Sequence, residues 1–282
     1  MDVPKRGGAG QSVPMEPVYT PVIGFARVLF AAQGLKFTIL GDDNVPTHGG
    51  AVMVINHTGY LDFAYAGLAA QKSGRLVRFM AKDTVFTHRV SGPLMRGMKH
   101  IPVDRAAGAG SYAAAVASLR DGEIVGVFPE ATISRSFELK DFKNGAARMA
   151  AEAGVPILPL VIWGSQRVWT KGLPRRLGRT NVPIILSVGE PIPVAADADV
   201  NEVTTHYKAV MAEMLDVARA AYEPLTGPDL KFLPARLGGT APTLAEATRL
   251  DREEAAERIR KRKAEREKKA AAEAAKKAGP TG

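Results

Sequence analysis

Residues 51–71 read AVMVINHTGYLDFAYAGLAAQ, and this stretch decides the fold class. Its first five residues are apolar and mostly β-branched, which is typical of a buried strand. A polar turn follows, and the segment from Leu61 to Gln71 is helix-like. A strand that leads through a turn into a helix is the repeating unit of α/β proteins.

The middle of the chain, roughly residues 36–195, repeats this alternation. The pattern predicts a largely parallel central sheet flanked by helices on both faces. The expected strands are Lys36–Leu40, Ala51–Ile55, Val77–Met80, Ile124–Phe128, Ile157–Ile162 and Ile184–Val188. The expected helices are Leu61–Gln71, Ser111–Leu119, Gly145–Ala153 and an amphipathic helix over 199–222. Because proline cannot donate a ladder hydrogen bond, Pro159 demotes its run as a strand or places it near a sheet edge.

Composition divides the chain into four segments. Residues 1–17 are rich in Gly and Pro and predict a disordered leader. Residues 18–35 are apolar with Arg27 as the only charge, which favours either a membrane-associating amphipathic helix or a core helix. Residues 36–222 form the main domain. Residues 223–282 form a Pro/Gly-rich linker and a charged basic tail, expected to be a solvated helix or disordered.

The composition excludes several classes of protein. With 46% hydrophobic and 24% charged residues, the 282-residue chain is ordinary for a globular protein. It has no cysteine, which excludes disulfides, thiolate metal sites and a cysteine nucleophile. Its formal charge of +9 predicts anionic partners, such as nucleic acid, an acidic membrane surface or phosphorylated small molecules. We expect neither a secretory signal nor a conventional transmembrane helix, because no long uninterrupted apolar window is present.

The first candidate site is the motif from Asn56 through His57 to Asp62, directly after an expected strand. In a regular helix, five steps of about 100° would leave the His57 and Asp62 side chains roughly 140° apart. They meet only if His57 lies in a turn before the helix and Asp62 lies in its first turn. Asp62 can then fix the imidazole tautomer and stabilise the imidazolium. The alternative is a loop histidine beside an aspartate that favours the helix dipole.

Three further segments carry weaker signals. The run from Gly97 to Arg105 ends in a guanidinium that suits phosphate. Residues 127–135 end a strand and continue through small hydroxyl residues, which can hold an anion. Residues 154–164 read as an apolar core strand. The sequence contains no Walker loop, GxGxxG, HExxH or GxSxG motif, and its five histidines include no closely spaced pair for a metal.

In this order the four segments resemble the bacterial type of the 1-acylglycerol-3-phosphate (lysophosphatidic acid) acyltransferase family, over roughly residues 20–220. The matching positions are Asn56, His57 and Asp62 in the NH-x4-D block, Gly97 and Arg105 in the second block, Phe128, Pro129, Glu130, Thr132 and Ser134 in the FPEGT block, and Val155, Pro156, Ile157 and Pro159 in the apolar block. The family's glycine in the third block is Ala131 here. The loop must therefore adopt a conformation that alanine tolerates, or the acceptor pocket is altered.

The resemblance implies an enzyme that transfers an acyl chain from acyl-CoA or acyl carrier protein to the sn-2 hydroxyl of 1-acylglycerol-3-phosphate. The product is phosphatidic acid, in phospholipid biosynthesis. It implies His57 as the general base, oriented by Asp62, and a substrate phosphate pocket of Arg105, Glu130 and Thr132. Within that pocket, a structural role for Glu130 is expected, because a carboxylate cannot hold phosphate directly. The supporting positions are Asn56, Gly97, Ser134, Lys82 and Lys143. No bound cofactor and no metal are expected, and the acyl thioester is a co-substrate.

The basic residues cluster near the motifs. They are Arg75, Arg78, Lys82, His88, Arg89, Arg96 and Lys99 between the first two blocks, and Lys171, Arg175, Arg176 and Arg179 after the fourth. With residues 18–35 they predict docking on the anionic cytoplasmic face of the cell membrane, as a peripheral or monotopic protein. The alternative is a solvated face.

Three rival functions stay open. The first is acylation of glycerol-3-phosphate or another lysolipid, because the same motifs serve several acceptors. The second is a basic nucleic-acid-binding protein, although no nucleic-acid module is recognised and we expect no such partner. The third is a catalytically silent lipid-binding homologue.

Overall fold

The computed structural model describes residues 16–104 and 108–277, and within them the main domain is built on one seven-stranded sheet. The strands are β1 (Lys36–Leu40), β2 (Ala51–Ile55), β3 (Val77–Lys82), β4 (Ile101–Val103), β5 (Ile124–Val127), β6 (Ile157–Trp163) and β7 (Pro183–Val188). Their spatial order is β1-β7-β6-β2-β5-β3-β4. Every neighbouring pair is parallel except β6 and β7, which confirms the predicted α/β class.

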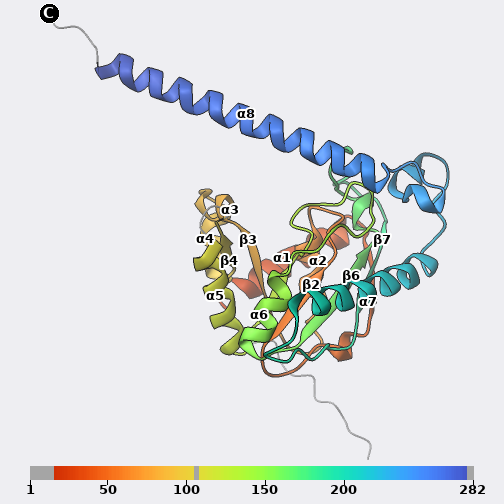
Figure 1. Cartoon of the computed structure of the whole chain (residues 1–282). Coiled ribbons are helices and arrows are strands. Elements are labelled where there is room, and N and C mark those ends of the chain that lie inside the picture. Colours follow the sequence, from red (N-terminus) through yellow and green to blue (C-terminus); the bar gives the residue numbers. More distant parts are fainter. Residues whose placement is uncertain (1–15, 105–107, 278–282) are drawn as a thin grey trace, which may run out of the picture.

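Helices cover both faces of this sheet (Figure 1). They are α1 (Tyr19–Ala32), α2 (Asp62–Ala69), α3 (Asp83–Thr87), α4 (Ser91–Gly97), α5 (Gly108–Arg120), α6 (Gly145–Ala153), α7 (Val200–Ala220) and α8 (Leu244–Lys277). Successive side chains of a strand point to opposite faces. Val52 and Val54 of β2 accordingly pack with α5, α6 and α7, whereas Met53 and Ile55 pack with α1 and α2. A strand buried on both faces has the continuous apolar sequence from which β2 was predicted.

The expectation for Pro159 was wrong. β6 is buried along its whole length and lies inside the sheet, between β7 and β2. The antiparallel ladder with β7 runs from Leu160 to Trp163, so Pro159 stands just outside it. Its carbonyl oxygen accepts a hydrogen bond of 2.9 Å from the backbone N–H of Gly189. The missing proline N–H therefore removes no bond from that ladder, and a central strand tolerates the residue.

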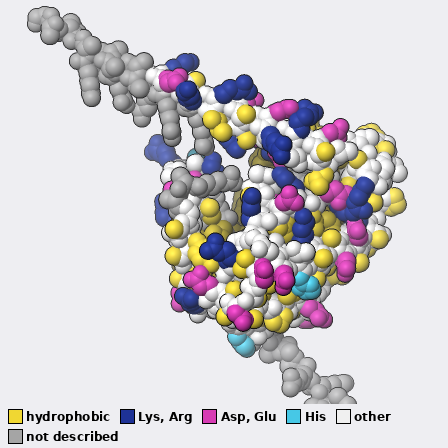
Figure 2. Space-filling model, viewed as in Figure 1, with side chains coloured by type: hydrophobic (Ala, Val, Ile, Leu, Met, Phe, Trp, Pro, Cys, Tyr) yellow, Lys and Arg dark blue, Asp and Glu magenta, His cyan; other side chains and the backbone are white. Residues whose placement is uncertain are grey.

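The two terminal helices are held in different ways. α1 buries Tyr19 and Phe30 against the domain but leaves Phe25 and Val28 about 70% exposed. α8 is a single helix that runs away from the body of the molecule (Figure 1). Lys and Arg side chains gather along its described part (Figure 2). Among the described residues, no helix combines the length and apolar character needed to cross a membrane. Of the predicted leader, residues 1–15 lie outside the described residues.

Candidate active site

The turn after β2 brings His57 and Asp62 together. His57 lies in this turn, and Asp62 is the first residue of α2. The Nδ1 atom of His57 is 3.0 Å from Oδ2 of Asp62, whose side chain is fully buried. The imidazole keeps 20% of its side chain exposed. This is the arrangement that the five-residue spacing requires for the two side chains to interact.

Asp62 presents one oxygen to three neighbouring groups. Its Oδ2 atom also accepts hydrogen bonds of 2.8 Å from the backbone N–H groups of Thr58 and Gly59. Because a carboxylate oxygen accepts hydrogen bonds, the His57 proton that faces it is on Nδ1. The Nε2 atom is then left with a lone pair, which is the state required of a general base.

A second loop, between β5 and α6, closes over His57 and holds its backbone. Oε1 of Glu130 accepts a 2.9 Å hydrogen bond from the His57 backbone N–H, and Oε2 accepts one of 3.1 Å from the backbone N–H of Lys140. The backbone N–H of Ser134 donates to the His57 carbonyl oxygen at 2.7 Å. Both polar groups of the His57 backbone are thus bound by this loop. Because backbone donors use both carboxylate oxygens, Glu130 positions the loop.

Burial changes the protonation of Glu130. The side chain is enclosed, and desolvation raises its pKa to about 8, although hydrogen bonds from the backbone of His57 and Lys140 favour the charged form. A raised pKa at a functional site is a common consequence of placing a carboxyl group in an apolar enclosure.

The third block has a left-handed turn at the position where the family carries glycine. Ala131 has φ of 59°, a conformation that costs a residue with a Cβ atom about 1–2 kcal/mol. The loop therefore keeps a backbone that suits glycine, and alanine adopts it with strain. The next residue, Thr132, accepts a 2.7 Å hydrogen bond at Oγ1 from Nζ of Lys140.

The supporting positions have distinct surroundings. Asn56 is buried and binds both the N–H and the carbonyl oxygen of Ile162 at 2.7 and 3.0 Å, which ties the end of β2 to β6. The Ser134 hydroxyl donates to the carbonyl oxygen of Glu138 at 2.7 Å. Gly97 ends α4, where a Cβ atom would come within 2.7 Å of the Val18 side chain. These three positions have structural contacts. The predicted phosphate ligand Arg105 lies outside the described residues.

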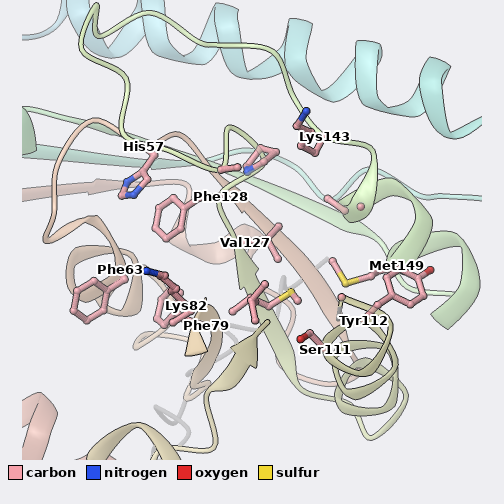
Figure 3. Close-up of a pocket in the computed structure, with 18 of the residues that line it drawn as sticks. His57, Phe63, Phe79, Lys82, Ser111, Tyr112, Val127, Phe128, Lys143 and Met149 are labelled. Atoms are coloured by element: carbon pink, nitrogen blue, oxygen red, sulfur yellow. The ribbon is translucent and has the colours of Figure 1, made fainter. Parts of the chain in front are cut away.

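An apolar cavity of about 590 Å³ extends from His57 into the domain. Figure 3 shows His57 and Phe128 on one side of it and Ser111, Tyr112 and Met149 on the other. The imidazole stacks on Phe128 with ring centroids 4.2 Å apart. Two lysines also line the cavity, the predicted Lys82 and Lys143. The remaining lining residues are Tyr60, Phe63, Phe79, Met80, Ala81, Val85, Met95, Val103, Gly108, Val127, Pro129, Ala131, Gly145 and Ala146.

The sequence did not single out every residue near the site. Lys140 stands in a polar loop without periodicity, and nothing in its spacing indicates contact with Glu130 and Thr132. Tyr60 and Trp169, whose rings lie 4.7 Å apart, come from separate turns and were not predicted either. Within the described ranges, no group of three or more His, Asp and Glu side chains is placed to hold a metal ion.

The part of the chain that carries this site is similar to known proteins. Residues 36–163 match the family model described as Acyltransferase. A chloroplastic 1-acyl-sn-glycerol-3-phosphate acyltransferase of Arabidopsis thaliana is 31% identical over 155 residues, which are 54% of this chain and 42% of the relative. The enzyme of that name from Bacillus subtilis is 29% identical over 138 residues, 49% of this chain and 66% of the relative. The matched parts thus span about half of this chain and between two fifths and two thirds of these relatives.

A solved structure has the same fold. The crystal structure of the 1-acyl-sn-glycerophosphate acyltransferase PlsC from Thermotoga maritima superposes with a TM-score of 0.61 at 21% identity, covering 73% of this chain and 81% of that one. The family match includes β1 to β6 and both loops that hold His57. Residues 36–163, which carry both loops, are therefore similar to the acyltransferase family, and the chain shares the fold of PlsC.

Proposed function

We propose that the protein transfers an acyl group from a thioester to the sn-2 hydroxyl of 1-acylglycerol-3-phosphate and forms phosphatidic acid for phospholipid synthesis. The observation that carries this proposal is the His57–Asp62 pair at the edge of an apolar cavity. The named activity of the curated relatives supports the choice of acceptor. Acyl-CoA and acyl carrier protein are both suitable donors, because each presents a thioester.

The chemistry follows from the orientation of the imidazole. His57 Nε2 takes the proton of the acceptor hydroxyl as the oxygen attacks the thioester carbonyl carbon. Asp62 stabilises the imidazolium that forms. When the tetrahedral intermediate collapses, the new C–O ester bond is kept and the C–S bond breaks. The thiolate leaves and receives the proton from the imidazolium, so His57 returns to its starting state and no acyl-enzyme is formed.

The cavity suits the hydrocarbon part of a substrate. Its lining is largely aliphatic and aromatic, and burial of an acyl chain in such a site is favoured by about 0.8 kcal/mol for each methylene group. Lys82 and Lys143 in the lining supply positive charge for a phosphate or a developing anion. We assign Arg105 and Thr132 to the phosphate side of the acceptor and Glu130 to positioning of the loop.

The surface near the cavity has features that suit binding to a membrane. Val85 of α3 and Met95 of α4 line the cavity, and Val90 and Leu94 beside them are exposed. The neighbouring helix α1 adds exposed apolar side chains, with Arg27 among them. A helix with an exposed apolar face next to basic residues binds anionic interfaces. We therefore place the enzyme as a peripheral protein on the cytoplasmic face of the cell membrane, where its lipid acceptor resides.

The test is the dependence of thiol release on the acceptor. Purified protein in detergent is given acyl-CoA with 1-acylglycerol-3-phosphate, with glycerol-3-phosphate or without acceptor, and phosphatidic acid is identified as the product. We expect release only with 1-acylglycerol-3-phosphate. Thiol release that occurs only with glycerol-3-phosphate would identify glycerol-3-phosphate as the acceptor. A parallel series with acyl carrier protein as donor would show which of the two donors is used. Absence of release with both donors and both acceptors would contradict the proposal.

Arg105 provides an independent test of the phosphate side. Removal of a guanidinium that binds phosphate weakens binding of the ligand that carries the phosphate. We expect Arg105→Ala to raise the KM for 1-acylglycerol-3-phosphate about tenfold, which corresponds to about 1.4 kcal/mol, and the KM for the acyl donor much less. An equal rise in both constants would contradict the assignment.

A further inference from the structure

Three cations converge on two carboxylates of α8. Oδ1 of Asp251 forms ion pairs with Arg135 Nε at 3.2 Å and Lys171 Nζ at 2.7 Å. Its Oδ2 atom forms one with Lys140 Nζ at 2.5 Å. Glu254 lies one helical turn further along α8. Its Oε2 atom forms ion pairs with Arg135 Nη2 at 2.6 Å and Lys171 Nζ at 2.9 Å. The side chains of the three cations are only 14–16% exposed. We call Arg135, Lys140 and Lys171 the cationic cluster.

The cationic cluster adjoins the reaction centre. Lys140 donates from its backbone N–H to Glu130 and from Nζ to Thr132. The other oxygen of Glu130 binds the backbone of His57, so one carboxylate links His57 to Lys140. The same loop lines the apolar cavity through Ala131. This loop therefore lies between an apolar cavity and the cationic cluster. A lipid phosphate has an apolar chain and a charged group, which suit the two sides.

The contact between α8 and the domain is mainly ionic. Ala247 is the one side chain of α8 that is buried among those the structure describes, and every described side chain beyond Ala255 is exposed. Burial raises the pKa of Asp251, but hydrogen bonds from Lys140 and Lys171 outweigh this effect and the net shift is downward. The carboxylates are therefore charged at neutral pH. A helix held by ion pairs without a broad apolar face can be displaced by a competing anion or by salt.

The two carboxylates match one phosphate group in charge. A phosphate monoester carries about −1.5 to −2 at pH 7 and presents three acceptor oxygens. Arginine binds such a group through its planar fork, and lysine binds it as a compact charge. We propose that the cationic cluster is a subsite for a substrate phosphate group, and that Asp251 and Glu254 occupy it as a reversible ionic latch until that group displaces them. The proposal rests on the proposed function only for the source of the phosphate, acceptor or donor.

Calorimetry on the full chain tests the subsite without turnover. Glycerol-3-phosphate and coenzyme A are the phosphate probes, and glycerol is the neutral control. The comparison is between wild type, the double variant Asp251→Asn/Glu254→Gln and the matched variant Glu253→Gln, which alters an exposed pair with Arg249 on the same helix. A latch closed in about nine molecules of ten would lower apparent affinity tenfold, so the double variant should bind about tenfold more tightly.

The outcomes separate the alternatives. A gain for glycerol-3-phosphate assigns the subsite to the acceptor, and a gain confined to coenzyme A assigns it to the donor. Equal affinity in wild type and double variant, the same gain in Glu253→Gln, or no binding of either probe would overturn the proposal. Adding Lys171→Met to the double variant should remove the gain, and a persistent gain would also overturn it. If the network is only structural, the double variant loses stability and phosphate affinity does not change.

A second measurement on the wild type covers the case in which the double variant folds poorly. Hydrogen exchange at residues 244–256 is followed with and without glycerol-3-phosphate and coenzyme A. Displacement of the latch predicts faster exchange there with the phosphate that binds, and unchanged exchange with both would overturn the proposal. The His57→Ala variant should show the same acceleration although it cannot turn over. Absence of acyl transfer by the wild type, with this response intact, would refute the proposed function and leave the latch standing.

Discussion

The two loops that form the site fix His57 by different means. The turn of residues 56–61 after β2 is short, and its geometry follows from a single acceptor, Asp62 Oδ2, which binds the imidazole and two backbone N–H groups. The loop of residues 128–144 after β5 is long and contains a strained residue, Ala131, and a buried carboxyl group, Glu130. The short turn therefore orients the imidazole of His57, whereas the long loop holds its backbone.

The largest effect should come from the short turn, in the variant Asp62→Asn. The side-chain oxygen of asparagine can take the place of Oδ2 and keep its contacts with His57, Thr58 and Gly59. It carries no full charge, so the imidazolium that forms loses its stabilisation. We expect kcat to fall on the order of 10³-fold, with the cooperative unfolding transition retained.

The matched control for Asp62→Asn is Glu202→Gln, which alters an exposed acidic residue in the first turn of α7. It should leave kcat unchanged. A kcat for Asp62→Asn within threefold of wild type would show that the charge of the carboxylate does not stabilise the imidazolium.

The long loop should give a smaller effect on rate and a clear effect on stability, in Glu130→Gln. The amide nitrogen of glutamine would face one of the two backbone donors, from His57 or Lys140, and leave it without an acceptor. A buried unsatisfied donor costs about 1–3 kcal/mol. We expect the free energy of unfolding, measured in urea, to fall by that amount. We also expect kcat to fall about tenfold, because the backbone of His57 shifts. Unchanged stability would mean that the loop does not depend on this carboxyl group.

The pH dependence of stability sharpens the same point. The pKa of Glu130 is raised from 4.5 to about 8, so the native state binds more protons than the unfolded state between these values. Its stabilising contribution is full below pH 4.5 and is lost as the pH rises through 8. The free energy of unfolding of wild type should therefore fall relative to that of Glu130→Gln from pH 5 to 9. Parallel pH profiles of the two proteins would contradict the assignment.

The smallest effect is expected at Ala131→Gly. Glycine removes a left-handed strain of about 1–2 kcal/mol and adds about 0.4–1 kcal/mol of unfolded-state entropy. The net result is a free energy of unfolding that is higher by roughly 0.5–1 kcal/mol, measured by thermal unfolding. Activity should be similar to or higher than that of wild type. The same substitution at the exposed helical residue Ala114 should instead cost about 1 kcal/mol. Destabilisation by Ala131→Gly, or a large loss of activity, would show that the loop needs the Cβ atom.

The two loops also differ in how far the sequence predicts them. The strands of residues 36–40 and 51–55 and the helix of residues 145–153 were predicted with the observed bounds, because each is a uniform run between turn residues. Spacing and turn chemistry allowed the contact of His57 with Asp62 but left a separate loop histidine as the alternative. The position of a strand within the sheet was not predicted, and Pro159 was wrongly expected to demote its run or place it near an edge.

Contacts between distant segments were beyond sequence reasoning. Lys140 and Asp251 are 111 residues apart, and neither stands in a motif. The alternating charges of residues 243–278 predicted a solvated helix or a disordered tail, and the structure describes a helix over Leu244–Lys277. Nothing in that alternation indicates which two carboxylates contact the domain, because this depends on where the linker positions the helix.

The most direct test of the account is thiol release from acyl-CoA in the presence of 1-acylglycerol-3-phosphate, measured for wild type and His57→Ala side by side in detergent. Removal of a positioned general base costs about 10²–10⁴-fold in rate. We expect His57→Ala to unfold cooperatively like wild type and to release no more than about a hundredth as much thiol. Release above a tenth of the wild-type rate by a folded His57→Ala protein would contradict the assignment of His57 as the base.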